Sequence, residues 1–163
     1  MWPSIIVTWQ VTMEAVMKIK DVMTDPAIVV SEDTTIEETA KVMRRYNIGS
    51  LPVVNDRDEL CGMITDRDIV IRNIARGMDA KIHKVGEIMS RNVVVTTPET
   101  DTVNATVIMS RDKVRRLPVL DKNRVVGVVA LGDLAVCNNL MYETGKTLCE
   151  ISEGCCSGFP QTH

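Results

Sequence analysis

The stretch LCGMITDRDI at residues 60–69 decides the fold, because its plan returns as VVGVVALGDL at residues 125–134. Each copy is an apolar run containing one glycine and followed by an aspartate, and these aspartates, Asp68 and Asp133, are 65 residues apart. Three further residues return 66 positions later: Met23, Met43 and Pro52 recur as Met89, Met109 and Pro118. Self-similarity at a fixed spacing indicates two units of the same structure.

The repeat divides the chain into successive segments. We expect an N-terminal extension at 1–19, a first repeat at 20–77, a linker at 78–85, a second repeat at 86–141, and a C-terminal helix and tail at 142–163. The linker has the length of an ordinary connection inside a compact domain, which is too short for a flexible tether. The two repeats are therefore predicted to pack directly against each other.

Both repeats show the order strand, helix, strand, strand, helix. In the helix predicted at 35–46, Ile36, Ala40 and Met43 share one face because they lie at i, i+4 and i+7. The predicted strands are 27–30, 51–54 and 60–64 in the first repeat and 93–95, 117–120 and 125–129 in the second. The last helices are predicted at 66–76, ending at Gly77, and at 132–141. This order predicts an α/β (α+β) fold of two β-α-β-β-α repeats.

The motifs of both repeats resemble the cystathionine-β-synthase (CBS) domain, whose tandem pair is known as a Bateman module. The matching residues are Val22-Met23-Thr24 and Ile88-Met89-Ser90, Ile48 to Val53 and Val114 to Val119, and Gly62 to Ile69 and Gly127 to Leu134. The resemblance covers about residues 20–141. It implies two repeats related by a pseudo-two-fold axis, with ligands bound in the cleft between them.

In this family the cleft binds adenosine-containing ligands through a G-h-h-[ST]-x-x-[DN] element, which Gly62, Thr65 and Asp68 match. The resemblance implies that Thr65 contacts a phosphate at a helix N-terminus and that Asp68 accepts hydrogen bonds from the ribose hydroxyls. Hydrogen bonds to a charged group contribute about 1.5–3 kcal/mol each. The same spacing is also nearly that of a capping box, which needs no ligand. Arg67 either reaches a phosphate or lies on the helix surface.

The second repeat departs from this element at Ala130, which has no hydroxyl. Asp133 nevertheless recurs, and an acid kept without its capping partner favours ribose binding. Arg116 occupies the position where related modules often carry a phosphate-binding arginine, whereas the first repeat has Ser50 there. The alternative is that Arg115 and Arg116 form a solvated strand edge.

Apolar side chains of the hairpins and leading strands are expected to contact the adenine. The candidates are Val29, Leu51 and Ile64 in the first repeat and Val94, Leu117 and Val129 in the second. The alternative for all of them is packing in the core, where such side chains usually lie. We expect the Thr65 and Asp68 half-site to bind better than the Arg116 and Asp133 half-site, and the two ligands to differ.

Composition excludes several classes of function. A net charge of −3, from 19 Lys+Arg and 22 Asp+Glu, gives no positive field for nucleic acid. No apolar run reaches the roughly 18 residues that a membrane span needs, and residues 1–16 lack the basic start of a secretory signal, so we expect a cytoplasmic protein without a membrane partner. The five cysteines lack the paired spacing of a zinc site, which predicts reduced thiols and no metal.

The N-terminal extension alternates apolar and polar residues over 5–13, which is typical of a half-buried strand. One interpretation is an added element that covers a sheet edge or a dimer seam. The other is a translation start placed too early, with Met17 as the natural beginning.

These observations predict a stand-alone regulatory protein and not an enzyme, because no nucleophile, base and orienting group occur together. We expect AMP, ADP, ATP or S-adenosylmethionine as a regulatory ligand, no obligatory cofactor, and a homodimer formed through helix faces that include Met43, Val107 and Met109. The alternative is an adaptor with vestigial sites, which dimerises and docks an unidentified protein target.

Overall fold

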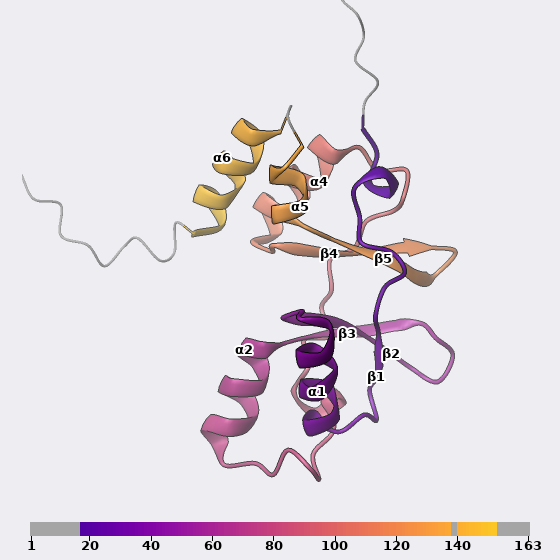
Figure 1. The fold of residues 1–163 in the computed structure, drawn as a ribbon, viewed down its shortest axis with the longest axis vertical. Coiled ribbons are helices and arrows are strands. Elements are labelled where there is room, and N and C mark those ends of the chain that lie inside the picture. Colours follow the sequence, from indigo (N-terminus) through magenta and orange to yellow (C-terminus); the bar gives the residue numbers. More distant parts are fainter. Residues whose placement is uncertain (1–16, 138–139, 153–163) are drawn as a thin grey trace, which may run out of the picture.

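The computed structural model describes residues 17–137 and 140–152. In these residues the first sheet has the order β1 (Val30–Ser31), β2 (Ser50–Val54), β3 (Leu60–Thr65), and the second consists of β4 (Arg116–Asp121) and β5 (Arg124–Ala130). β1 runs parallel to β2, and both hairpins are antiparallel. Figure 1 shows the two sheets toward the middle of the molecule, with α1 and α2 beyond one sheet and α4, α5 and α6 beyond the other. The predicted pair of α/β (α+β) repeats is confirmed.

The first helix of each repeat begins at a capping side chain. α1 (Ile36–Tyr46) follows Thr35, whose Oγ1 accepts a hydrogen bond from the Glu38 N–H at 3.2 Å. α4 (Thr102–Asp112) follows Asp101, whose carboxylate accepts one from the Val103 N–H at 2.7 Å. The helix predicted at 35–46 is confirmed, and Ile36 and Met43 from its predicted apolar face are buried.

The last helices of the two repeats differ in length. In the first repeat α2 (Asp66–Asp68) continues into the π-helix η2 (Ile69–Asn73) and the 3-10 helix η3 (Ile74–Arg76), and the chain leaves through Gly77 at φ 68°. In the second repeat α5 (Leu131–Ala135) is short, so the prediction of a continuous helix over 132–141 was wrong. The chain turns after Ala135 because the Cys137 N–H bonds the Leu134 carbonyl and Leu140 is buried in the second core.

The segments that lead into the repeats are less regular than predicted. We call residues 17–28 the first arm and residues 83–94 the second arm. They contain the 3-10 helix η1 (Ile19–Asp21) and the helix α3 (Val85–Ile88). Of the strand predicted at 27–30, only Val30 lies in β1. The strand predicted at 93–95 does not form, and the neighbouring Thr96 makes only an isolated bridge to Val119.

Each arm packs into the other repeat. Thr24 exchanges backbone hydrogen bonds with Val128 of β5, and Ser90 does the same with Met63 of β3, at 2.9–3.1 Å. The glycines of the two repeated stretches make room for this pairing, since a side chain at Gly62 would overlap Met89 and one at Gly127 would overlap Met23. The exchange creates the pseudo-two-fold relation and makes each core depend on both repeats.

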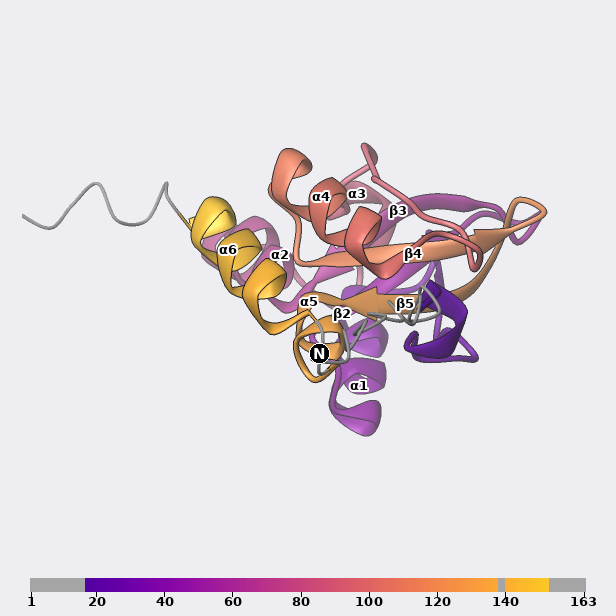
Figure 2. The same ribbon diagram turned by 90° about the horizontal axis from the view of Figure 1, so that it is seen from above.

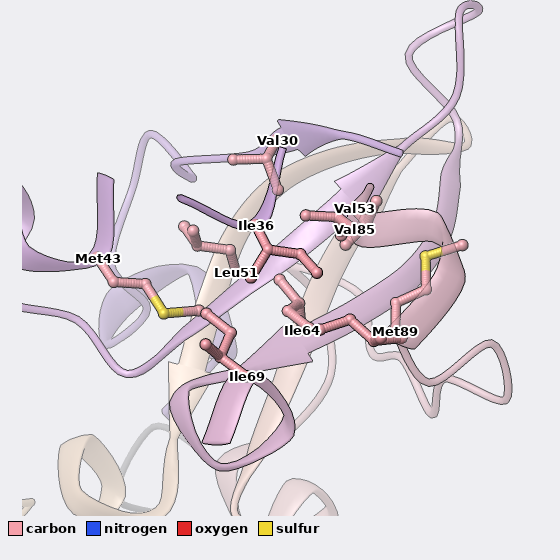
Figure 3. Packing of buried hydrophobic residues seen from close by; sticks show 10 residues of the cluster. Val30, Ile36, Met43, Leu51, Val53, Ile64, Ile69, Val85 and Met89 are labelled. Carbon is pink, nitrogen blue, oxygen red and sulfur yellow. The ribbon is translucent and has the colours of Figure 1, made fainter. Parts of the chain in front are cut away.

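The two hydrophobic cores are composed accordingly. The first contains side chains from α1, β2, β3 and η2 together with Val85, Ile88 and Met89 of the second arm (Figure 3). The second contains side chains from α4, β4, β5 and α5 together with Ile19 of the first arm. Met43 and Met109 lie in these cores with exposures of 7% and 0%, so they are not on exposed helix faces as we had expected, whereas Val107 is exposed.

The C-terminal helix α6 (Met141–Ser152) lies against α4 and α5 of the second repeat, as Figures 1 and 2 show. Thr144 and Thr147 are buried in this contact, and Ser110 donates a hydrogen bond to the Glu150 carboxylate. The first repeat has no such covering helix within the described residues. Residues 1–16, which include the half-buried strand predicted at 5–13, lie outside the described residues.

Among the helices in the described part of the chain, none has the length and apolar character needed to cross a bilayer.

Candidate ligand-binding clefts

Two clefts lie where the repeats meet, and each has a volume of about 230 Å³. We name them after their acidic residues, the Asp68 cleft and the Asp133 cleft. The Asp68 cleft combines Met63, Thr65 and Asp68 of the first repeat with the second arm and with Val114, Arg115 and Arg116. The Asp133 cleft combines Val128, Ala130 and Asp133 of the second repeat with the first arm and with residues 47–50. The two clefts therefore occupy equivalent places about the pseudo-two-fold axis, and each is built from both repeats.

In the Asp68 cleft, Thr65 and Asp68 form a complete capping box. The Thr65 Oγ1 donates to Asp68 Oδ2 at 2.6 Å and accepts from the Asp68 N–H at 3.1 Å, while the Thr65 N–H donates to Oδ2 at 3.0 Å. The capping box, which the sequence offered as the alternative to ligand binding, is therefore present in the structure. It leaves ligand binding open, because each carboxylate oxygen has more than one acceptor site.

The other oxygen of Asp68 connects the cleft to the second arm. Asp68 Oδ1 lies 3.2 Å from the Arg72 Nε, and the Asp68 side chain is only 14% exposed. Arg72 Nη1 also donates to the Ile88 carbonyl at 2.8 Å and to Ser90 Oγ at 3.2 Å. A group that binds Asp68 will therefore act on a hydrogen-bond network that holds the arm of the other repeat.

Asp133 keeps the backbone half of the same arrangement. The Ala130 N–H donates to Asp133 Oδ2 at 2.8 Å, although Ala130 has no hydroxyl to complete the cap. The retention of this acid therefore has a structural reason as well as the functional one that we inferred from the sequence. The position of Arg72 is occupied by Cys137, whose thiol contacts the Asp133 carbonyl at 3.6 Å. The second cleft thus lacks the arginine link to an arm.

The arginines that we singled out are distributed unequally. Arg116 is exposed and lines both clefts, and so does Ser50, which is buried and occupies the equivalent position in the first repeat. Arg115 lines the Asp68 cleft, and its counterpart in the Asp133 cleft is Gly49. Positive charge is therefore concentrated on the Asp68 cleft, with Arg116 shared.

The apolar surface of the clefts differs from the one we expected. Val94, which comes from the other repeat than Thr65, lines the Asp68 cleft. Four of the other candidates are completely buried in the cores and are inaccessible to a ligand: Leu51, Ile64, Leu117 and Val129. Val29 is 38% exposed but lines neither cleft, and the exposed Arg67 lines neither.

The alternation of strand residues explains this difference. Successive side chains of a strand point to opposite faces, so Ile64 enters the core when Met63 and Thr65 face the cleft. The same rule places Val129 in the core and Val128 and Ala130 on the Asp133 cleft. Met63 could therefore have been predicted from the sequence. Thr65 was already expected to contact the ligand, and Met63, two residues earlier in the same strand, points to the same face.

No cysteine is among the described residues that line the two clefts. The described cysteines Cys61, Cys137 and Cys149 are free thiols, and burial raises the pKa of Cys61. Residues 17–137 and 140–152 contain no group of three or more His, Cys, Asp or Glu side chains placed to hold a metal ion.

Comparison with known proteins gives consistent similarities. The family model for the CBS domain matches residues 19–73 and 85–137. The CBS domain-containing protein YhcV of Bacillus subtilis is 42% identical over 134 residues, which cover 82% of this chain and 94% of that protein.

Two solved structures are similar in fold and sequence. One is the CBS domain pair of protein MJ0100 in complex with methylthioadenosine and S-adenosyl-L-methionine, with a TM-score of 0.69 and 30% identity over 81% of this chain and 99% of that one. The other is Hypoxic Response Protein I with two coordinated zinc ions, with a TM-score of 0.67 and 34% identity over 73% of this chain and 97% of that one.

Proposed function

The chain belongs to the CBS domain family as a tandem pair, and we propose that it is a regulatory module whose two clefts bind adenosyl ligands. The observation that carries this proposal is the composition of each cleft, in which an aspartate at a helix start faces the arm of the other repeat. A ligand there contacts both repeats at once. The adenosyl ligands of the MJ0100 pair support the same ligand class.

We assign different roles to the residues of the two clefts. Asp68 and Asp133 accept hydrogen bonds from ribose hydroxyls, Thr65 and the arginines hold phosphate, and Val94 and Ile28 lie against the base. The Asp68 cleft suits AMP, ADP or ATP, because Arg115 and Arg116 both line it. The Asp133 cleft, with Arg116 alone, suits a ligand of lower negative charge such as S-adenosylmethionine.

Ligand binding would act by shifting populations of conformations. A ligand stabilises whichever arrangement of the repeats it contacts best, and the shift is limited by its difference in affinity for the two arrangements. In the Asp68 cleft, Arg72 carries the effect because it bonds both Asp68 and the second arm. We propose no catalytic step and no obligatory cofactor.

Assembly as a homodimer is part of this proposal. The helical stretch from η2 to η3 exposes Val70, Ile71 and Ile74, with exposures of 51%, 51% and 63%. This apolar face replaces the methionines that we had expected in the contact. A second candidate function, a protein adaptor with vestigial clefts, is favoured by the same face and by the Thr65 cap, which forms without a ligand.

Calorimetric titration of the nucleotide-free protein with AMP, ATP and S-adenosylmethionine tests the proposal. We expect Asp68→Asn and Asp133→Asn each to weaken one binding step by at least about tenfold, because each removes hydrogen bonds to a charged group. Glu38→Gln is the matched control, since it makes the same acid-to-amide change in the capping box of α1, outside both clefts. No heat from any of the ligands with folded protein would favour the adaptor.

A further inference from the structure

A third cavity, of about 530 Å³, lies between α5 and α6. Its walls are mostly small or apolar side chains, namely those of Ala130, Leu131, Ala135, Met141 and Leu148. The helix that closes it, α6, follows the part of the chain that matches the CBS domain. Within the described residues, no helix of the first repeat takes the place of α6. The cavity therefore depends on α6, which lies outside the two segments that match the CBS domain.

The polar groups at this cavity are cationic. Arg115 and Arg116 line it, and neither forms a salt bridge with a carboxylate in residues 17–137 and 140–152. The hydroxyl of Thr144, which also lines the cavity, donates to the Leu140 carbonyl at 2.7 Å. A mostly apolar pocket of this volume with a few convergent polar groups is the usual form of a small-molecule site.

We infer that this cavity binds the apolar part of an anionic ligand whose charged group is held by Arg115 and Arg116. Guanidinium groups bind carboxylate and phosphate with bidentate hydrogen bonds, and apolar walls favour the removal of a hydrocarbon group from water. Two sources share this chemistry. One is a free acyl carboxylate, and the other is an adenosyl ligand that carries an apolar group on its phosphate, since the same arginines line the Asp68 cleft.

Gly145 makes the inference testable without disturbing the arginines. Gly132 and Gly145 both line the cavity, and a Cβ built at either has no atom within 4 Å. Gly145→Leu places a side chain in this open space and replaces a poor helix former with a good one, so the variant should fold at least as well. Gly145→Ala fills much less of the cavity and serves as the graded control.

Calorimetry with sodium octanoate tests the free source, with acetate and 1-octanol as controls that lack the chain or the charge. We expect octanoate to bind at one site per chain, Gly145→Leu and Arg115→Gln/Arg116→Gln to weaken it at least tenfold, and Gly145→Ala to weaken it less. The octyl ester of AMP tests the other source. It should bind at least tenfold tighter than AMP if the nucleotide carries the apolar group, and Gly145→Leu should remove the gain and leave AMP unchanged.

The inference is overturned if octanoate binds no tighter than acetate and the octyl ester binds no tighter than AMP. It is equally overturned if the tighter binding survives in Gly145→Leu. It is also overturned if Gly145→Leu changes the oligomeric mass in sedimentation, because a second copy of the chain would then occupy the cavity. The octanoate result does not depend on adenosyl binding. Failure of AMP to bind, with octanoate binding intact, would contradict the proposed function and leave this inference standing.

Discussion

The two clefts have the same plan and different chemistry. The Asp68 cleft has a hydroxyl at the helix cap, two arginines, and Arg72 joining its acid to the opposite arm. The Asp133 cleft has Ala130 at the cap, one shared arginine, and Cys137 in place of Arg72. The two repeats therefore share the backbone geometry of the cleft and differ in its polar groups. The two clefts are therefore unequal in their chemistry within one symmetric frame.

The largest effect should come from breaking the frame that both clefts share. Ile19 is completely buried in the second core although it precedes the first repeat, so Ile19→Ala should lower the free energy of unfolding by about 3 kcal/mol. Urea denaturation should show one transition, because each core includes an arm of the other repeat. Met17→Ala, at a 44% exposed position in the same arm, is the control and should change stability little. Two separate transitions would contradict the account.

The arginines should sharpen the difference between the clefts. Arg116→Gln should weaken AMP binding at the Asp68 cleft and S-adenosylmethionine binding at the Asp133 cleft, each by about tenfold or more, because the residue lines both clefts and a hydrogen bond to a charged group contributes about 1.5–3 kcal/mol. Arg115→Gln should weaken binding at the Asp68 cleft alone. Isothermal titration resolves the two steps, and equal effects of the two variants on both steps would count against the unequal sites.

The smallest effect should come from exchanging the caps. Ala130→Thr supplies the hydroxyl that the second repeat lacks and should raise the free energy of unfolding by about 1 kcal/mol, whereas Thr65→Ala should lower it by a similar amount. Thermal unfolding of both variants measures the change. A loss of stability in Ala130→Thr would show that the two helix starts are not equivalent.

Elements whose signal is local were predictable from the sequence. Apolar spacing at Ile36, Ala40 and Met43 located α1, and pairs of short apolar runs joined by turn residues located both hairpins. The short α5 was not predictable in this way, because burial of Leu140 in the second core ends the helical path. The sequence analysis also placed each arm in the repeat that follows it along the chain, whereas the structure pairs it with the sheet of the other repeat. Sequence order carries no information on which sheet an arm pairs with.

The candidate site was predictable in its polar part. Thr65, Asp68, Ser50 and Arg116 meet in one cleft, and Asp133 meets Ser50 and Arg116 in the other. The apolar part required the exchange of the arms, which brings Val94 to Asp68 and keeps Val29 away from it. Apolar residues of the cleft such as Met63 were not predicted, although strand alternation places Met63 on the same face as Thr65.

The most direct test asks which arm serves which aspartate. Val94→Trp and Ile28→Trp enlarge the side chains that line the Asp68 and Asp133 clefts. Titration with AMP and S-adenosylmethionine, on variants shown by urea denaturation to be folded, compares them with Asp68→Asn and Asp133→Asn. The account predicts that Val94→Trp removes the Asp68-dependent step and Ile28→Trp the Asp133-dependent step. The reverse pairing, or no effect of either tryptophan, would contradict clefts built from both repeats.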